Sequence, residues 1–509
     1  MSPQGGRRCE RRASQETRSQ RRWAQEALRK RRQAEGLGPL RPPALPNRTS
    51  SYNSVEEEQQ GRQDAVLAQL RLMSAKLPFF LRRLEKIPDF RDPKKVKHKL
   101  TVLTIWGILV FVFQMASRRQ ANHKLSKPMF LENLRTFFPE LQSCPHQDTL
   151  NRLLAGIDVS QIEEAHVELI RQLIRKKKFL RFLIQNCYPI AFDGTQKHRR
   201  ADLLDDSWLE RSVGKEDEKE TQYYVYVLEA SLAFQNGMVL PMFSEFLDYA
   251  AGDTERSKQD CELKAFYRLA KRLKRSFPRL PILVLGDGLF ANGPVMELCR
   301  KNHWDFMIVL QDGSLPSVWE EVHGLRKLQD NNQFERRWAD RRQRFWWVNE
   351  IEYRFGLNQR KRQVVHVVVC EESWEEIDQK TNEMVTKTSR HVWLSNRPLN
   401  QGNVHERCNL GARHRWGIET GFLVEKCHGY CYEHIFSHNW NAMRGYHYLM
   451  RIGHTLNVLA HYSAALIPLV RTLGVRGVID FVRETMSGPW LDTTQVRLAQ
   501  ATPYQLRLE

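Results

Sequence analysis

The sequence lacks any apolar run long enough to span a membrane. Residues Thr101–Ala116 form an uncharged apolar stretch of 16 residues, and lysines and arginines flank it closely on both sides. A spanning helix needs about 20 such residues, so this stretch predicts a buried core helix. The N-terminus is basic and polar, without the apolar segment of a secretory signal.

Cysteine is scarce, and acidic residues are fewer than basic ones. Nine scattered cysteines in 509 residues argue against the disulfide framework of a small secreted domain and fit a reducing cytosol. The 79 lysines and arginines exceed the 59 acidic residues, which gives a formal net charge of +20. Such a chain favours a polyanionic partner, and we expect nucleic acid rather than an anionic membrane.

The pattern changes several times along the chain. Residues 1–75 read as a basic, disordered tail, although "RRWAQEALRKRRQAE" within it could form a basic helix on DNA. In residues 76–186, apolar residues recur at spacings of three and four, which predicts a helical domain with a basic rim. Short strand-like runs follow, in the order β-β-β-α-β-α-β, and two of them are joined at Asn236-Gly237, a strong hairpin signal. This order predicts an α/β fold with a mixed sheet.

Two of the predicted strands end in an aspartate followed by glycine. "YPIAFDGTQ" carries Asp193 and "LPILVLGDGLFAN" carries Asp287. Taken singly, each aspartate could merely begin a turn. As a pair in one sheet, with a further acid on a later helix, they predict a carboxylate site for Mg²⁺, a cation that prefers oxygen ligands. Two such ions could clamp the attacking and leaving oxygens of a phosphoryl transfer.

A later segment, "RHRWGIETGFLVEKCHGY", reads as one helix over residues 413–430. At 100° per residue, Arg415, Glu419 and Lys426 share one face of that helix. Glu425 is turned by about 120° from Glu419, so only one of the two can face the sheet. We expect Glu419 to be the ligand and Glu425 to lie solvated on the polar flank, so that Glu425→Gln keeps most activity.

These motifs resemble a known family. "AFDGT" and "LGDGLFAN" resemble the RNase H-like core of DDE transposases, and Arg415, Glu419 and Lys426 match the R-x3-E-x6-K part of the Y-R-E-K signature of one group of bacterial insertion-sequence transposases. The position of the signature tyrosine is Ala412 here, which leaves His414 or Arg413 to take its DNA contact.

The resemblance implies an α/β fold with an RNase H-like mixed-sheet core, a β-strand insertion and flanking helical regions. The parts are a helical DNA-binding domain at 76–186, the first part of the core at 187–320, a β-rich insertion at 321–397, the final part of the core at 398–465 and a C-terminal helical region at 466–509. It also implies that Asp193, Asp287 and Glu419 are the catalytic residues and hold two Mg²⁺ ions, for which Mn²⁺ can substitute. Arg415, Lys426 and His414 would contact DNA.

The implied function is metal-dependent cleavage of double-stranded DNA at the ends of an insertion sequence, followed by strand transfer into target DNA. Two copies would act as a homodimer in a synaptic complex, in the cytoplasm of a bacterium, at the nucleoid. Two alternatives remain open: a structure-selective nuclease on the same fold, and a transposase-derived DNA-binding protein without activity. A further pattern, C-x3-C-x2-H-x3-H from Cys427 to His438, is too compressed for an ordinary zinc finger, and we expect packing to explain it.

Overall fold

The structure is a computed structural model that describes residues 15–38, 44–47, 49–214, 219–248, 261–378 and 380–509. The chain divides into two compact units. The main unit comprises Leu45–Phe290, Val295–Met307 and Glu406–Glu509, and the insertion unit comprises Met1–Ala44, Ala291–Pro294 and Ile308–His405. All residues predicted to carry chemistry lie in the main unit.

The main unit begins with helices and returns to helices at its end. The first group is α2 (Val55–Leu84), α3 (Leu100–Val112), α4 (Arg118–Leu125), α5 (Pro128–Phe137), α6 (Gln147–Gly156) and α7 (Ser160–Arg175). The second group is α11 (Gly417–Cys427), α12 (Trp440–His461), α13 (Ile467–Ser487) and α14 (Thr493–Ala501). Helix α3 is buried on all sides and packs against α12 and α6, so the predicted core helix is confirmed.

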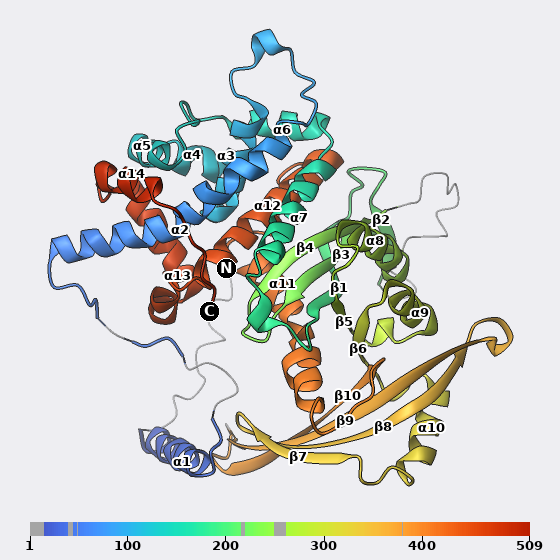
Figure 1. Cartoon of the computed structure of the whole chain (residues 1–509). Helices are drawn as coiled ribbons and strands as arrows, with labels where there is room; N and C mark the ends of the chain where they lie inside the picture. The colour runs from blue at the N-terminus through green and yellow to red at the C-terminus, as the bar shows by residue number, and fades with distance from the viewer. Residues whose placement is uncertain (1–14, 39–43, 48, 215–218, 249–260, 379) are drawn as a thin grey trace, which may run out of the picture. The chain divides into compact units, whose positions relative to one another are not determined.

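Helix α12 is the central helix of this unit. It packs against α2, α3, α6 and α7 and also against the sheet strand β4 (Val239–Leu247), as Figure 1 shows. Eighteen of its 22 residues are buried, and these include histidines and an arginine. Buried charge of this kind must be paired to be tolerated, so α12 is the place to look for polar networks.

The sheet of the main unit follows the predicted strand order with one addition, the short strand β2 (Leu209–Val213), which the sequence did not predict. Its strands are β1 (Tyr188–Arg200), β2, β3 (Glu220–Ala233), β4 and β5 (Ile282–Gly286), with α8 (Glu262–Ser276) between the last two. The spatial order is β2-β3-β1-β5, and β4 also pairs with β3. β1 runs antiparallel to β3 and parallel to β5. The predicted hairpin at Asn236-Gly237 is confirmed, because β3 and β4 pair across it.

Two elements lie where the two units divide. Helix α9 (Gly293–Asn302) and strand β6 (Asp305–Val309) follow β5 in the chain, as the sequence predicts. In the part of the chain that the structure describes there are ten strands, and the pairings just given and those of the insertion unit are antiparallel except β1 with β5. The protein is therefore of the mixed α/β class.

The insertion unit is a long antiparallel meander. Its elements are α1 (Gln15–Ala34), α10 (Pro316–Arg326), β7 (Gln333–Trp338), β8 (Arg341–Phe355), β9 (Lys361–Ile377) and β10 (Met384–Ser395). The strand order is β10-β9-β8-β7, so the segment expected to be β-rich, 321–397, does consist mainly of strands. Helix α1 packs on β9, and its Arg21 donates to Asn382 at 2.8 Å.

The prediction of a disordered tail over 1–75 is wrong where it can be compared. Residues 15–34 form α1 and residues 55–84 form α2. Contacts from distant parts of the chain hold both helices, and a composition argument cannot see such contacts. Residues 1–14 of that tail lie outside the described residues.

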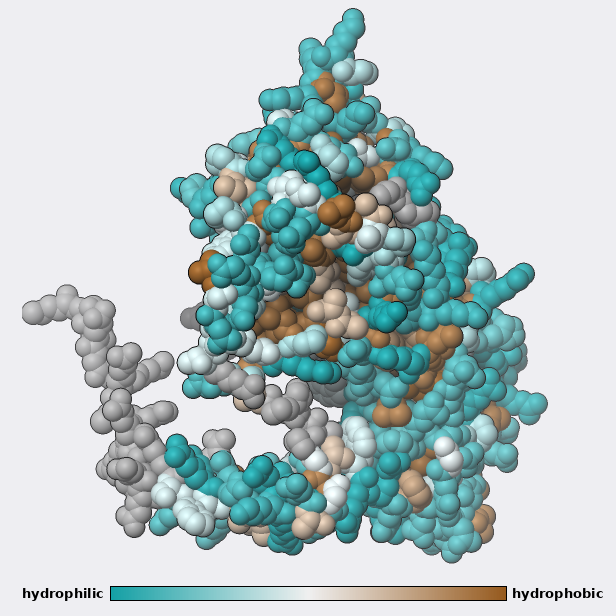
Figure 2. All heavy atoms as spheres, turned by 60° about the vertical axis from the view of Figure 1, so that its left-hand side comes forward, coloured by the Kyte–Doolittle hydropathy of each residue, from teal (hydrophilic) through white to brown (hydrophobic). Residues whose placement is uncertain are grey.

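Hydrophilic residues cover most of the face shown in Figure 2, and hydrophobic residues show as separate patches. This surface fits a chain with a formal charge of +20. Within the described ranges, no helix is both long enough and apolar enough to cross a membrane.

Candidate active site

Asp193 lies inside strand β1, not at a strand end. β1 continues to Arg200, and Asp193 pairs in register with Glu229 on β3. The predicted turn after Asp193 is therefore wrong. Gly194 has a different purpose, because a Cβ at this position would lie 2.5 Å from Cε1 of Tyr226 and 2.7 Å from Cδ of Glu262. The glycine gives those two side chains room against β1, on the face of the sheet opposite to the Asp193 side chain.

Asp287 directly follows β5, as the sequence predicts. In the parallel pairing of β1 with β5, Ala191 is the partner of Leu285. Two residues further along each strand are Asp193 and Asp287, so the pairing brings both acids to the same edge of the sheet. The Oδ1 of Asp287 also accepts the backbone N–H of Leu289 at 2.9 Å, so this aspartate begins the next turn as well.

Glu419 lies in the first turn of α11, a helix shorter than the sequence predicts. The chain enters it through a π-helical turn, Glu406–Gly411, and a 3-10 segment, Ala412–Trp416. Arg415 therefore lies outside the α-helix that carries Glu419. Its Nη2 nevertheless donates to Glu419 Oε1 at 2.7 Å.

Arg415 joins two of the predicted acids. Its Nη1 lies 3.7 Å from Asp193 Oδ2, while Nη2 bonds Glu419. Arg415 is only 5% exposed, and its Nε and Nη1 are buried without a hydrogen-bond partner. The charge of Arg415 therefore acts on the two carboxylates. The side chain is too buried to serve as an exposed contact for a DNA phosphate.

The charge around Asp193 is not balanced. Burial raises the pKa of its carboxyl to about 7, Arg415 opposes that rise, and the nearby Glu419 and Asp287 add to it. The same effects show that the three acids are close enough to feel one another's charge. A raised carboxyl pKa with specific charged neighbours is typical of functional sites.

Two further residues belong to this group, and the sequence did not identify them. Tyr226 on β3 donates its hydroxyl to Glu262 Oε1 at 2.7 Å, and Glu262 opens helix α8. Burial raises the pKa of Glu262, with a smaller contribution from the charge of Asp287. Glu262 lies in "KQDCELKAF", a stretch that looks family-like in sequence but suggests no role; its first three residues, 258–260, lie outside the described residues. We call Asp193, Asp287, Glu419, Glu262, Tyr226 and Arg415 the site cluster.

The other two predicted DNA contacts are placed differently. The Nζ of Lys426 lies 3.1 Å from Glu433 Oε1 and 5.9 Å from the ring centre of Tyr432. Burial, with the charge of Arg413, lowers the pKa of His414 to about 4, so its ring is neutral at pH 7. In the described part of the chain, no hydrogen bond or ion pair joins either side chain to an acid of the site cluster, and both stay predictions as DNA contacts.

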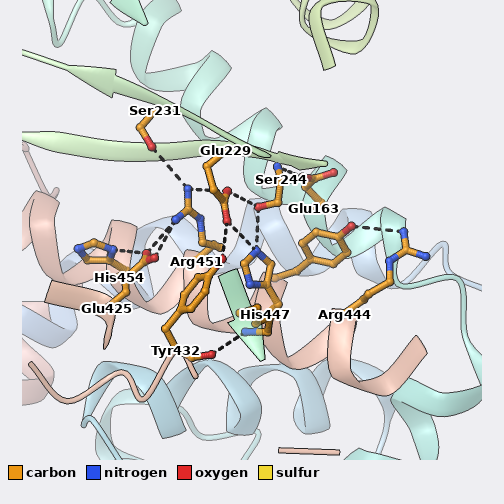
Figure 3. Close-up of polar contacts among 12 residues, drawn as sticks. Glu163, Glu229, Ser231, Ser244, Glu425, Tyr432, Arg444, His447, Arg451 and His454 are labelled. Atoms are coloured by element: carbon orange, nitrogen blue, oxygen red, sulfur yellow. Dashed lines mark hydrogen bonds and ion pairs between the residues drawn. The ribbon is translucent and has the colours of Figure 1, made fainter. Parts of the chain in front are cut away.

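The expectation that Glu425 is solvated is wrong. Glu425 is 0% exposed and lies on the buried stripe of α11 with Ile418 and Phe422. Arg451 Nη1 donates to both of its oxygens at 3.0 and 2.9 Å, and His454 Nδ1 lies 2.6 Å from Oε1 (Figure 3). Burial alone would raise its carboxyl pKa, but Arg451 and His454 outweigh burial and hold the pKa at about 2.

The carboxylate oxygens of the site cluster are the kind of ligand that a hard cation prefers. The carboxylates also repel one another, and a bound cation would relieve that repulsion. Their present spacing does not form a ready ligand set. Nowhere in the described ranges do three or more His, Cys, Asp or Glu side chains lie close enough to hold a metal ion. That statement also covers the Cys427–His438 pattern. In the site cluster, the guanidinium of Arg415 supplies the positive charge.

Comparison with known proteins adds one match. Residues 81–170 match the family model described as DDE_Tnp_1-associated. The matched segment runs from the end of α2 through most of α7, within the predicted helical domain, and contains none of the site cluster. No curated protein matches the chain. The family match points to a transposase-related protein, through a segment that accompanies a DDE transposase domain.

Proposed function

We propose that this chain is a DDE-type DNA transposase of the Y-R-E-K group with an RNase H-like core. The observation that carries the proposal is the site cluster: Asp193 and Asp287 on neighbouring parallel strands, with Glu419 on α11 close enough to act on the Asp193 pKa. The family match at 81–170 is independent support, because it lies in another part of the chain.

Asp193, Asp287 and Glu419 are the residues that would hold Mg²⁺ or Mn²⁺, two ions in all. When bound, such ions supply positive charge for the phosphate and for the nucleophile and leaving oxygens of a phosphoryl transfer. Arg415 keeps Asp193 and Glu419 together when no other cation is near them. The excess of basic residues in the chain and the DNA contacts proposed for Lys426 and His414 would orient a double-stranded DNA end over the acids, while the buried Arg415 acts on the acids themselves.

The reaction in this proposal has two steps at one site. Water attacks a phosphodiester at the element end and the P–O3′ bond breaks, which leaves a 3′-hydroxyl and a 5′-phosphate. That 3′-hydroxyl then attacks a phosphodiester of the target, whose own P–O3′ bond breaks and releases a target 3′-hydroxyl. As ligands, Asp193, Asp287 and Glu419 would be ionised during both steps. Two copies of the chain would hold the two ends, and the setting would be the bacterial nucleoid.

The test uses the purified full chain, a duplex carrying the inverted repeats that flank its coding sequence, and Mg²⁺. We expect cleavage at the repeat ends and joined products, and we expect Asp193→Ala to lose both while still binding the duplex. Asp202→Ala is the matched control, because that side chain is 79% exposed and lies outside the site cluster.

The products also separate the alternatives. Cleavage without joined products would indicate a nuclease on this fold. Binding without cleavage in the wild-type chain would indicate a DNA-binding protein derived from a transposase. Cleavage retained by Asp193→Ala would remove this acid from the active site.

A further inference from the structure

Helix α11 is held at both of its ends. Near its start, Glu419 bonds Arg415, which also reaches Asp193 on β1. At the same end Gly417 allows close approach to β4, since a Cβ there would lie 3.0 Å from Val239. Near the other end, Glu425 is bound by Arg451 and His454 of α12, as Figure 3 shows.

Arg451 also contacts the sheet. Its Nη1 bonds Glu425, and its Nη2 lies 3.0 Å from Glu229 Oε2 on β3. Arg451 is 4% exposed, and both of its carboxylate partners are 0% exposed. One buried guanidinium therefore bridges a helix and a strand. The planar fork of arginine suits such a bridge, and lysine could not supply two fixed donors.

Glu229 is itself fixed by three other side chains. Ser244 Oγ donates to its Oε2 at 2.6 Å, Tyr432 Oη donates to Oε1 at 3.3 Å, and His447 Nε2 lies 3.3 Å from Oε1. All of these residues are buried. Figure 3 shows these side chains converging on Glu229. We call Glu229, Glu425, Arg451, His447 and His454 the buried network.

The place of Glu229 in the sheet connects this network to the active site. Glu229 on β3 is the register partner of Asp193 on β1. Directly opposed residues of an antiparallel pair have their side chains on the same face, close together. Helix α11 is thus tied twice to one rung of the sheet: through Arg415 to Asp193, and through Arg451 to Glu229.

We propose that Arg451, by bridging Glu425 and Glu229, sets the position of α11 and so the separation of Glu419 from Asp193. Arg451, Glu425 and Glu229 are positioning residues and touch neither substrate nor metal. The inference rests on the proposed function for the meaning of that separation. A buried ion pair stabilises a fold little more than apolar residues of the same volume, so stability alone is a weak reason for this arrangement.

The main test variant is Glu425→Gln, which keeps the size of the side chain and removes its charge. We expect kcat for cleavage of the end duplex to fall about 100-fold, since a displacement of about 1 Å can cost that much. Affinity for Mn²⁺, measured without DNA by the paramagnetic resonance of the free ion, should weaken about tenfold. The Kd for the end duplex should not change. This is the opposite of the sequence-based expectation for Glu425.

Glu163→Gln is the matched control. Glu163 is also a buried carboxylate in the main unit, paired with Arg272 and accepting the backbone N–H of Ser244 at 2.7 Å, but it contacts no residue of α11. It should keep wild-type kcat and Mn²⁺ affinity per folded molecule. Arg451→Lys retains the charge without the bridge, and should lose kcat as Glu425→Gln does.

Two results would overturn the inference: wild-type kcat and Mn²⁺ affinity in Glu425→Gln, or equal losses in Glu163→Gln. A wild-type chain that neither binds Mn²⁺ nor cleaves would refute the proposed function instead. Hydrogen exchange then decides the positioning role by itself. Amides of α11 that exchange faster in Glu425→Gln than in Glu163→Gln support it, and equal exchange in the two variants refutes it.

Discussion

Two groups of charged side chains lie next to each other in the main unit, and they treat their carboxylates in opposite ways. In the site cluster, Arg415 pairs with two of the four carboxylates, and the pKa of Asp193 is raised to about 7. In the buried network, both carboxylates pair with Arg451 and each also contacts a histidine, and the pKa of Glu425 is lowered to about 2. Among the described residues, two carboxylates of the first group have no ion pair, whereas both carboxylates of the second group have one.

The two groups have different roles: the site cluster carries the proposed chemistry, and the buried network holds the elements around it in place. Glu419 keeps 37% of its side chain exposed, while Glu425, six residues later on the same helix, has none. Carboxylates without a partner cation destabilise a fold, and proteins retain them at functional sites, where a ligand uses their charge. Balanced charge in the interior fixes geometry instead. The three predictions below test this contrast, beginning with the largest expected effect.

Arg451→Met should strongly destabilise the fold. It leaves Glu229 and Glu425 buried without their shared cation, and breaking a buried pair in this way costs about 3–5 kcal/mol. The measurement is the free energy of unfolding by urea denaturation at pH 7. Arg175→Met is the control, because this side chain is 71% exposed, and should stay within about 0.5 kcal/mol of wild type. A loss below about 1 kcal/mol for Arg451→Met would mean that Arg451 does not balance the network.

Asp193→Asn should stabilise the protein at high pH. The native carboxyl has a pKa of about 7, above its usual value near 4 in the unfolded chain, so the native state binds the proton more tightly. Wild-type stability should therefore fall as the pH rises from about 4 to about 7, and the variant should lack this part of the fall.

At pH 8 without divalent cations, Asp193→Asn should be more stable than wild type by a few kcal/mol, at most about 4. At pH 4 the two should be alike. The measurement is denaturation at a series of pH values. Added Mg²⁺ should stabilise wild type at pH 8 more than the variant. If the free energy of unfolding depends on pH in the same way in both proteins, the pKa of Asp193 is not raised in the native state.

Glu262→Gln should have the smallest effect of the three. Its carboxylate accepts the Tyr226 hydroxyl and lies near Asp287. The amide oxygen of glutamine can still accept that hydroxyl, but the bond is then to a neutral group and weaker by about 1 kcal/mol, so we expect the cleavage rate to fall at most about tenfold. Tyr226→Phe removes the bond altogether and leaves the carboxylate. Equal losses would assign the effect to the bond, and an unaffected Tyr226→Phe would assign it to the charge of Glu262.

Sequence reasoning was successful where the signal was local. Strand periodicity and turn residues located the β3–β4 hairpin, and the buried run before Asp287 located the end of β5. The pairing of β1 with β5 then brings Asp193 and Asp287 together, although Asp193 is within its strand. The spacing placed Arg415 and Glu419 on one face, and the two side chains do pair, although Arg415 was expected to contact DNA and the helix begins later than expected.

Prediction from the sequence failed where the residue that pairs with a side chain lies far along the chain. The apolar pattern of α11 could not show that Glu425 is buried, because the residues that make burial tolerable, Arg451 and His454, are 26 and 29 positions later. Tyr226 and Glu262 were missed for a similar reason. Each lies in an ordinary strand or helix pattern, and only the sheet register and the start of α8 bring them against β1 at Gly194, within reach of the Asp193 and Asp287 charges.

Gly194 has a consequence for how this strand tolerates variation. It is neither in a turn nor at a positive φ, so backbone conformation does not demand glycine there. The demand comes from the Tyr226 ring and the Glu262 carboxyl, which fill the volume of the missing side chain. In a saturation library of β1, alanine at 194 should be depleted in the wild-type background, and it should be recovered when the library is built on Tyr226→Ala.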